Sequence, residues 1–326
     1  MKNEILAVLK NSRDYISGQQ LCDKFRVSRT AVWKVMEQLK EEGYEIEAVR
    51  NRGYRLKSCP DVISEAEILS VLQTEWAGRR TVCYKETDST NNRARDAGEK
   101  DGVHGMLFAA ERQSAGKGRR GRAWDSPGGS SIYMSILLRP DIRPAKAPML
   151  TLVMGLSAAE GIKETTGVDA KIKWPNDIVA DGKKICGILT EMVTEIEYIN
   201  YVVIGVGINV NQESFPEGLE GKATSLRIAG GRTFGRAEII AAVLKAFEKN
   251  YELFLEAGDL SQLRARYDRL LVNLGRDVRV LEPGNEYEAR AKGISDEGEL
   301  IVTLSDGKER HVFSGEVSVR GIYGYV

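Results

Sequence analysis

The chain is poor in the residues that build metal clusters, disulfide frameworks and histidine-based catalytic sites. It has two histidines, His104 and His311, and four cysteines that lie far apart and form no Cys-x-x-Cys pair. This scarcity argues against a zinc cluster and against a histidine triad. Scattered single cysteines are typical of a protein from a reducing compartment.

Long apolar runs are missing as well. No stretch reaches the roughly 20 apolar residues that a membrane span needs. The N-terminal segment interrupts its apolar residues with charges and has no cleavage-site pattern. We therefore expect no signal peptide and no membrane anchor, and a cytoplasmic location.

Charge of one sign does not dominate, because 47 Lys and Arg balance 47 Asp and Glu. The charges are unevenly spread, however. Residues 1–60 hold 12 basic and 8 acidic side chains, a net of +4, so the remainder has a net of −4. This modest excess permits nucleic-acid contact at the N-terminus without establishing it.

At 326 residues the chain exceeds what one hydrophobic core usually holds, so we expect several domains. The pattern of elements changes character twice, and we place the domains at 1–62, 63–270 and 271–326. No internal repeat or low-complexity tract interrupts them.

The first segment has the pattern of a winged helix-turn-helix. Ser17 with Gln20 forms a capping-box pattern before a short helix, and Ser28 offers a second N-cap. The helix after Ser28 has apolar residues at helical spacing, with Gly43 placed as its C′ residue. Residues 45–50 and 54–57 read as two strands about a turn, which forms the wing.

The basic residues of this segment lie off its apolar stripe. The N-terminal end of a second helix of this kind reaches base edges in the major groove, and a basic wing suits phosphates. The candidates for DNA contact are Ser28, Arg29, Thr30, Trp33, Lys34, Arg50 and Arg52. A small helical protein-interaction domain with a solvated basic face is the alternative.

The central segment is predicted to be a mixed α+β sheet, because its strands do not alternate regularly with long helices. Strands are predicted at 82–85, 106–110, 132–138, 171–174, 185–191 and 201–210, and helices at 145–165 and 236–256. The last segment has short strands at 278–281, 287–294, 300–304, 309–313 and 317–320, separated by turn residues. Such spacing favours a small antiparallel β-barrel.

A glycine-rich basic loop is the most informative stretch. Gly116, Gly118 and Gly121 match the spacing of a dinucleotide fingerprint, but Pro127 and two glycines follow where that motif requires a helix. Glycines let backbone N–H groups approach a phosphate, and five Lys and Arg within 112–122 can neutralise it. The alternative is a solvated surface loop.

The sequence Gly-Lys-Gly-Arg-Arg-Gly-Arg at 116–122, followed by Trp124, resembles the loop of biotin protein ligases. Three further stretches occur in the family's order: Asp-Ser-Thr-Asn at 88–91, Lys-Trp-Pro-Asn-Asp at 173–177 with Lys-Lys-Ile-Cys-Gly at 183–187, and Gly-Val-Gly-Ile-Asn at 205–209. With the winged helix and a C-terminal domain expected to be SH3-like, the resemblance covers essentially the whole chain. It points to the group that doubles as biotin operon repressor.

The resemblance implies a set of site residues. Biotin-binding positions are Ser89, Thr90, Asn91, Gln113, Lys117, Gly118, Arg119, Lys184 and Gly187. Nucleotide-binding positions are Arg122, Trp124, Asn176, Asn209 and Arg320. Lys184 and Arg119 are the implied catalytic cations, and Asp177 is a candidate for Mg²⁺. Taken without the resemblance, Ser89 reads as a helix N-cap, Gln113 as a surface amide, Lys184 as a solvated charge beside a turn, and Trp174 as core packing.

The implied reaction has two steps, formation of biotinyl-5′-AMP from biotin and Mg-ATP, and acylation of a lysine on a biotin carboxyl carrier protein. The implied partners are that carrier, operator DNA and a second copy of the chain when the adenylate is bound. Two alternatives stay open. One is a related acyl-adenylating enzyme such as a lipoate ligase, and the other is a regulator whose large domain only senses a small ligand.

Overall fold

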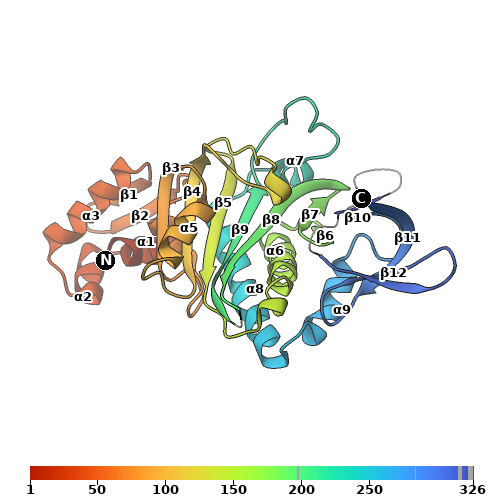
Figure 1. The fold of residues 1–326 in the computed structure, drawn as a ribbon. Coiled ribbons are helices and arrows are strands. Elements are labelled where there is room, and N and C mark those ends of the chain that lie inside the picture. Colours follow the sequence, from red (N-terminus) through yellow and green to blue (C-terminus); the bar gives the residue numbers. More distant parts are fainter. Residues whose placement is uncertain (197, 283, 315–317, 322–325) are drawn as a thin grey trace.

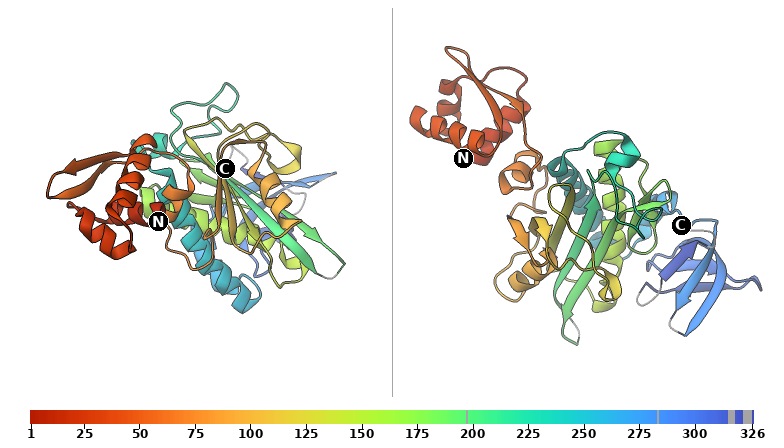
Figure 2. Two further views of the ribbon diagram at one scale, coloured as in Figure 1. Left: turned by 90° about the vertical axis from the view of Figure 1, so that its left-hand side faces the viewer. Right: turned by 90° about the horizontal axis from the view of Figure 1, so that it is seen from above.

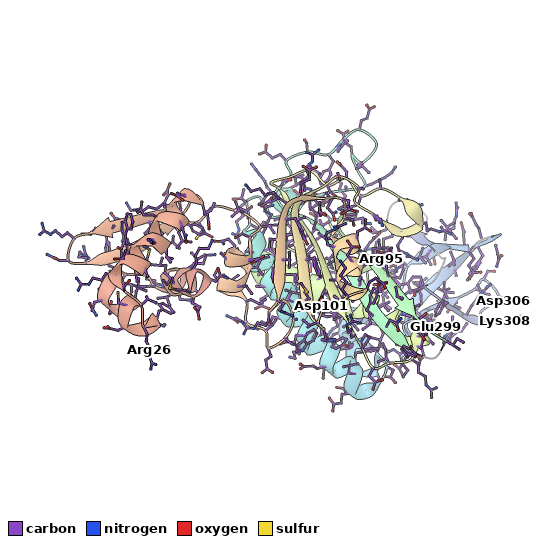
Figure 3. All side chains as sticks on the ribbon, turned by 60° about the vertical axis from the view of Figure 1, so that its left-hand side comes forward. Arg26, Arg95, Asp101, Glu299, Asp306 and Lys308 are labelled. Atoms are coloured by element: carbon purple, nitrogen blue, oxygen red, sulfur yellow. The ribbon has the colours of Figure 1, made fainter. Side chains whose placement is uncertain are left out.

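The computed structural model describes residues 1–196, 198–282, 284–314, 318–321 and 326. The molecule is elongated, with the N-terminal helices at one end, a seven-stranded sheet in the middle and the C-terminal strands at the other end (Figures 1 and 2). Figure 3 shows Arg26 at one extremity and Asp306 with Lys308 at the opposite one. None of the helices described is both long and apolar enough to cross a membrane.

The N-terminal unit is a winged helix-turn-helix, as predicted. Its elements are α1 (Lys2–Asn11), α2 (Gly18–Phe25), α3 (Arg29–Glu41), β1 (Glu45–Val49) and β2 (Gly53–Ser58). The capping box of Ser17 and Gln20 is formed in full, and Ser28 Oγ accepts from the N–H of Ala31. Gly43 follows the last helical turn at a φ of 97°, a conformation that favours glycine.

The central sheet has the strand order β3-β4-β5-β9-β8-β7-β6, with β3 parallel to β4 and every other described pair antiparallel. Its strands are β3 (Thr81–Thr87), β4 (Met106–Gln113), β5 (Ser131–Leu138), β6 (Lys171–Lys173), β7 (Asp177–Ala180), β8 (Lys183–Thr194) and β9 (Ile199–Asn209). The predicted mixed sheet is therefore confirmed. Strand β7 had not been predicted.

Helices cover both faces of this sheet. On one face α6 (Met149–Thr166) and α8 (Arg236–Ala257) pack on each other and bury the main core, while α5 (Thr90–Gly98) covers part of the other face (Figure 1). The remaining helices are α4 (Glu65–Val71), α7 (Leu226–Gly230) and α9 (Ser261–Leu270).

The helix predicted at 145–165 begins later, at Met149. Pro144 and Pro148 explain the difference, because a proline disfavours helical geometry in the residue before it and lacks an N–H. A single 3₁₀ turn at Pro144–Lys146 precedes the helix instead.

The C-terminal strands form a small antiparallel sheet in the order β13-β12-β11-β10-β14. They are β10 (Asp277–Glu282), β11 (Asn285–Ile294), β12 (Leu300–Thr303), β13 (Glu309–Val312) and β14 (Ser318–Gly321). Within the part of the chain that the structure describes, β13 and β14 are not paired, so the sheet is not closed into a barrel. Its apolar residues join the main core of the central sheet.

Candidate functional site

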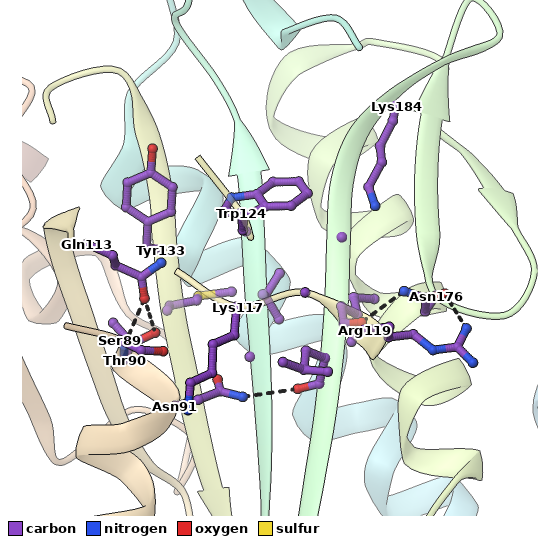
Figure 4. Close-up of a pocket in the computed structure, with 18 residues that line it drawn as sticks. Ser89, Thr90, Asn91, Gln113, Lys117, Arg119, Trp124, Tyr133, Asn176 and Lys184 are labelled. Atoms are coloured by element: carbon purple, nitrogen blue, oxygen red, sulfur yellow. Dashed lines mark hydrogen bonds between the residues drawn. The ribbon is translucent and has the colours of Figure 1, made fainter. Parts of the chain in front are cut away.

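A hollow lies on the α5 face of the central sheet, beneath the loop at 114–130 (Figure 4). It is small, with a volume of about 50 Å³, and is partly open to solvent. The side chains around it come from α5, β4, β5, β8, β9 and the loop, so distant parts of the sequence meet there. All nine residues predicted to bind biotin line it: Ser89, Thr90, Asn91, Gln113, Lys117, Gly118, Arg119, Lys184 and Gly187.

The turn before α5 is organised by Asp88. Its carboxylate accepts from the N–H of Ser89 at 2.7 Å and from Asn92 Nδ2 at 2.7 Å. Burial would raise the pKa of Asp88, but the hydrogen bonds from Asn92, Ser89 and Thr87 outweigh it and lower that pKa to about 2. Asp88 is therefore a fixed anion that orders the turn.

Ser89 occupies the N-cap position of α5, as its sequence context indicated, but within the described structure its side chain makes no capping bond. Ser89 exposes only 3 % of its surface and borders the hollow. Beside it, Gln113 Oε1 accepts from the N–H of Thr90 at 2.8 Å and from Thr90 Oγ1 at 3.1 Å. These groups form a buried polar wall.

Ser135 supports this wall from below and had not been singled out in the sequence. Its Oγ lies 2.7 Å from Thr90 Oγ1 and 2.6 Å from Asn91 Oδ1. Asn91 Nδ2 donates to Glu191 Oε2 at 2.6 Å. Because Thr90, Asn91 and Gln113 are each held by neighbouring polar groups, this part of the wall is preorganised.

Glycines of β8 and β9 leave space for other side chains at the floor of the hollow. A Cβ on Gly207 would lie 2.7 Å from the Nε1 of Trp124, and one on Gly187 would lie 3.0 Å from Trp124 Cζ3. A Cβ on Gly205 would collide with Asn91. The glycines at 187, 205 and 207 therefore let an indole and an amide lie directly on the sheet.

The glycine-rich loop is folded back over the hollow. Gly118 N–H donates to Arg122 O at 2.7 Å, and Trp124 N–H donates to Gly116 O at 2.9 Å. Lys117 and Ala123 form an isolated bridge, so the loop is a small closed turn. Arg120 at its tip has a φ of 59° and is exposed.

Arg119 turns inward from this loop. Its Nη1 donates to Asn176 Oδ1 at 2.8 Å and its Nη2 to the carbonyl of Ser314 at 2.8 Å. Asn176 is itself held by a bond from its Nδ2 to Ile188 O at 3.1 Å. Burial lowers the pKa of Arg119, but a guanidinium stays charged at neutral pH.

Lys184 lies opposite, at the start of β8. Its Nζ is 2.5 Å from Asp177 Oδ1 and 5.1 Å from the ring centre of Trp124. Its backbone is pinned by bonds to Lys222 and Thr224. The neighbouring Lys183 is exposed, so only Lys184 of the pair enters the site.

A second hollow adjoins the first, and Trp124 lines both. It is lined by the predicted nucleotide-binding residues Arg122, Trp124, Asn176 and Asn209, together with Asp177 and several residues that had not been predicted. Those additional residues include Gln212, Phe215, Pro216 and Lys222. Five residues line both hollows: Gly118, Arg119, Trp124, Asn176 and Lys184.

Trp174 and Asn209 already have hydrogen-bond partners within the chain. Trp174 is core packing with 1 % of its surface exposed, as expected, and its Nε1 donates to Gly298 O at 3.1 Å. Asn209 Nδ2 donates to Thr224 O at 3.1 Å, so its amide is already engaged within the chain. The side chain of Arg320 lies outside the described residues.

Tyr133 also lines the first hollow and had not been predicted as a site residue. It stands on β5 inside an apolar run, where its ring reads as core. Its hydroxyl donates to Pro127 O at 2.9 Å, which ties the end of the loop to the sheet.

The helix-turn-helix presents its predicted DNA-contact residues to solvent. Ser28, Arg29, Thr30, Trp33, Lys34, Arg50 and Arg52 are all exposed. Trp33 exposes 54 % of its surface, so it does not pack into the core as most tryptophans do. Arg52 stacks on the ring of Tyr15 at 4.4 Å, which steadies the wing.

Three family profiles match the chain in succession. An HTH domain matches residues 2–55, the biotin/lipoate A/B protein ligase family matches residues 83–209, and a biotin protein ligase C-terminal domain matches residues 274–320. Their order follows the three parts of the fold.

Similar proteins match over nearly the whole length. The bifunctional ligase/repressor of Bacillus subtilis is 39 % identical over 94 % of both chains. The bifunctional ligase/repressor of Escherichia coli is 30 % identical over 97 % of this chain and 96 % of its own. A solved structure of the biotin protein ligase of Aquifex aeolicus with biotin and ATP has a TM-score of 0.66 and 31 % identity, covering 74 % of this chain and 99 % of that one.

Proposed function

The chain belongs to the biotin protein ligases, in the group of bifunctional ligase/repressors, and we propose that its active site is the pair of adjoining hollows on the α5 face of the central sheet. It is an ATP-dependent biotin–protein ligase that forms biotinyl-5′-AMP, transfers biotin to a carrier lysine and represses transcription in response to biotin. The observation that carries the assignment of the site is that Arg119, Lys184 and Trp124 stand where the two hollows meet.

The first hollow is proposed to hold biotin. The ureido ring of biotin has two N–H groups and a carbonyl, each of which would cost about 1–3 kcal/mol if it were buried without a partner. Ser89, Thr90, Gln113 and the backbone of 117–119 border the hollow with donors and acceptors. Asn91 and Gly187 complete its sides, and the side chain of Lys117 is steadied by Asn92 at 2.6 Å.

The second hollow is proposed to hold the nucleotide, with Trp124 as an aromatic wall and Arg122 at its rim. Asn176 and Asn209 remain candidates for contacts with the adenine edge. Both amides already bond within the chain, and each still has a second N–H and a second oxygen lone pair for such contacts. Arg320 is a further nucleotide candidate from the C-terminal sheet.

The two cations have distinct roles in this proposal. The biotin carboxylate attacks the α-phosphorus and pyrophosphate leaves, so negative charge accumulates between the hollows. Lys184 and Arg119 are fixed there by Asp177 and Asn176, and such preorganised cations contribute about 3–4 kcal/mol each to stabilising a transition state. In the second step the carrier amine attacks the acyl carbon of the adenylate and AMP leaves.

The donor set also fits a Mg²⁺ ion that is held largely by nucleotide phosphates. No cluster of three or more His, Cys, Asp or Glu side chains suited to a metal occurs among the described residues. Mg²⁺ is commonly bound by one or two carboxylates together with substrate phosphates. Asp177 lines the nucleotide hollow and would supply that carboxylate, while the ion would offset phosphate charge.

The loop at 114–130 is proposed to shield the adenylate from water. Its turn is closed by its own backbone bonds, and Arg119 fastens it to Asn176 and Ser314. Excluding water prevents hydrolysis of a mixed anhydride. The loop is expected to be more mobile when the site is empty.

The remaining assignments complete the proposal. The partners are a biotin carboxyl carrier protein, operator DNA read by the exposed face of α3 with the wing, and a second copy of the chain when the adenylate is bound. The location is the cytoplasm, and the domains extend over 1–62, 63–270 and 271–326.

Biotin-dependent exchange of pyrophosphate into ATP tests the function directly. We expect exchange with biotin and none with lipoate or without an acid. Exchange with lipoate alone would indicate a lipoate ligase. A protein that binds biotin without any exchange would be a ligand-sensing regulator.

A further inference from the structure

Arg236, the first residue of α8, is a buried cation away from the proposed reaction centre. Only 1 % of its surface is exposed. A guanidinium has five N–H donors, and all of them are engaged here. Nε donates to Asp61 Oδ2 at 3.0 Å, Nη1 to Glu111 Oε2 at 2.8 Å and Ser131 O at 3.2 Å, and Nη2 to Glu111 Oε1 at 3.0 Å and Asp61 O at 2.5 Å.

Glu111 connects Arg236 to the base of the loop at 114–130. It stands on β4 two residues before Gln113, and its Oε2 also accepts from the N–H of Gly129 at 3.3 Å. Ser131 begins β5, where the loop ends. The guanidinium therefore bonds to Glu111 near the end of β4 and to Ser131 at the start of β5. These positions are the two stems of the loop at 114–130, which connects the two strands.

Asp61 connects the same cation to the chain that leads from the winged helix. It lies between β2 and α4, in the segment that joins the helix-turn-helix to the ligase part. Ile63 in that segment donates its N–H to Glu111 Oε1 at 2.6 Å. Asp61 Oδ2 also accepts from Asn211 Nδ2 at 3.0 Å, beside the proposed nucleotide hollow.

We propose that Arg236 is a positioning residue. It couples closure of the loop at 114–130 to the segment that joins the DNA-binding domain to the ligase part. This inference rests on the proposed function of the site. The bidentate pair of Arg236 with Glu111 holds its geometry tightly, because the nearly fully buried guanidinium would be an uncompensated charge without its carboxylate partners. Movement of the loop stems is therefore transmitted to Asp61 and Ile63.

A second contact between the two parts of the chain provides a matched control. Lys10 of α1 and Tyr44 both bond to the carboxylate of Glu67 on α4. This cluster also fastens the winged helix to the ligase part, but its described bonds do not reach the loop stems. Docking of the two parts can thus be distinguished from coupling to the loop.

The test uses the full chain and hydrogen exchange of backbone amides, with and without biotin plus ATP. In the wild type, adenylate formation should slow exchange of the Ile63 amide about tenfold, in parallel with amides of the loop. In Asp61→Asn, the loop should still be protected while the response at Ile63 is weakened, because only the bond of Ile63 to Glu111 remains. Lys10→Met should keep both responses.

Adenylate release supplies a second measurement, because loosening the ends of the loop at 114–130 should let the intermediate leave sooner. Asp61→Asn should release radiolabelled biotinyl-AMP several-fold faster than the wild type, and Lys10→Met should not. Arg236→Lys, which keeps the charge but loses the bidentate geometry, should resemble Asp61→Asn if Arg236 positions the segment.

The outcomes separate the two proposals. A wild type that forms the adenylate without any change at Ile63 would overturn the coupling, as would equal release rates in Asp61→Asn and Lys10→Met. A folded wild type that forms no adenylate would instead overturn the proposed function.

Discussion

Lys184 and Asp177 form an ion pair between β8 and β7, with 2.5 Å between Nζ and Oδ1. Both side chains are mostly shielded from solvent, exposing 24 % and 17 % of their surfaces. The pair holds the ammonium beside the ring of Trp124, at the junction of the two hollows. The ion pair thus aims the lysine at the junction of the two hollows.

Lys184→Ala should slow adenylate formation by about 10²–10³-fold, because a preorganised cation contributes about 3–4 kcal/mol in a shielded site. Single-turnover formation of biotinyl-AMP measures the effect. Lys183→Ala is the matched control, since Lys183 is exposed on the adjacent position of β8. A near-normal rate in a folded Lys184→Ala protein would contradict the role of Lys184.

Arg119→Gly should let the adenylate escape and acylate lysines of bystander proteins. The reason is that Arg119 fastens the loop to Asn176 and Ser314. Biotin blotting of an added protein that is not a carrier detects the escape. Arg112→Gln is the control, because it removes an exposed charge 3.5 Å from Glu86 outside both hollows. Equal retention of the intermediate by both variants would show that the lid account is wrong.

Gly207→Ala should weaken ligand binding at least tenfold. The new methyl group would lie 2.7 Å from Trp124 Nε1, closer than packed carbon atoms tolerate, so the indole must leave the sheet. Calorimetric titration with biotin and ATP measures the loss. Gly155→Ala on α6 is the control, because its nearest neighbour is 3.8 Å away and alanine favours a helix. Unchanged affinity in Gly207→Ala would mean that Trp124 does not shape the site.

Dimerisation should depend on the adenylate. One winged helix covers one half-site, and specific operators usually need two. If ordering of residues 117–122 completes a dimer surface, biotin with ATP should raise the sedimentation coefficient of the wild type, and Arg119→Gly should reduce that rise. This is a population shift toward the DNA-binding state. Dimerisation of equal strength without biotin and ATP would argue against the link.

Local signals in the sequence predicted the N-terminal unit closely. The capping box of Ser17 with Gln20, the N-cap at Ser28 and the C′ residue Gly43 all formed as expected. Each of these signals acts within one helical turn, so neighbouring residues determine it. The glycine-rich loop could be predicted equally well, because its glycines and cations lie in one short stretch of the sequence.

Other features depend on contacts between distant residues and left little trace in the sequence. Ser135 and Tyr133 lie in an apolar strand and read as core, yet one supports the polar wall and the other holds the loop. Arg236 at the start of a helix reads as a solvated charge, but its partners are more than 100 residues away. Strand β7 has only four residues, too few for a periodic pattern.

The stability of the protein should fall as the pH is lowered below about 6.5, and His104 should account for part of that loss. Burial lowers the pKa of His104 from 6.5, and its Nδ1 accepts from the N–H of Arg139 at 3.1 Å. His104 therefore binds a proton more readily in the unfolded chain than in the folded chain. Its contribution to the free energy of unfolding is fully present above pH 6.5 and is lost as the pH falls through its folded pKa. The slope for one such proton is at most about 1.4 kcal/mol per pH unit. Urea denaturation at pH 8 and pH 5.5 should show a smaller pH difference in His104→Gln than in the wild type. An identical pH response in His104→Gln and the wild type would rule His104 out.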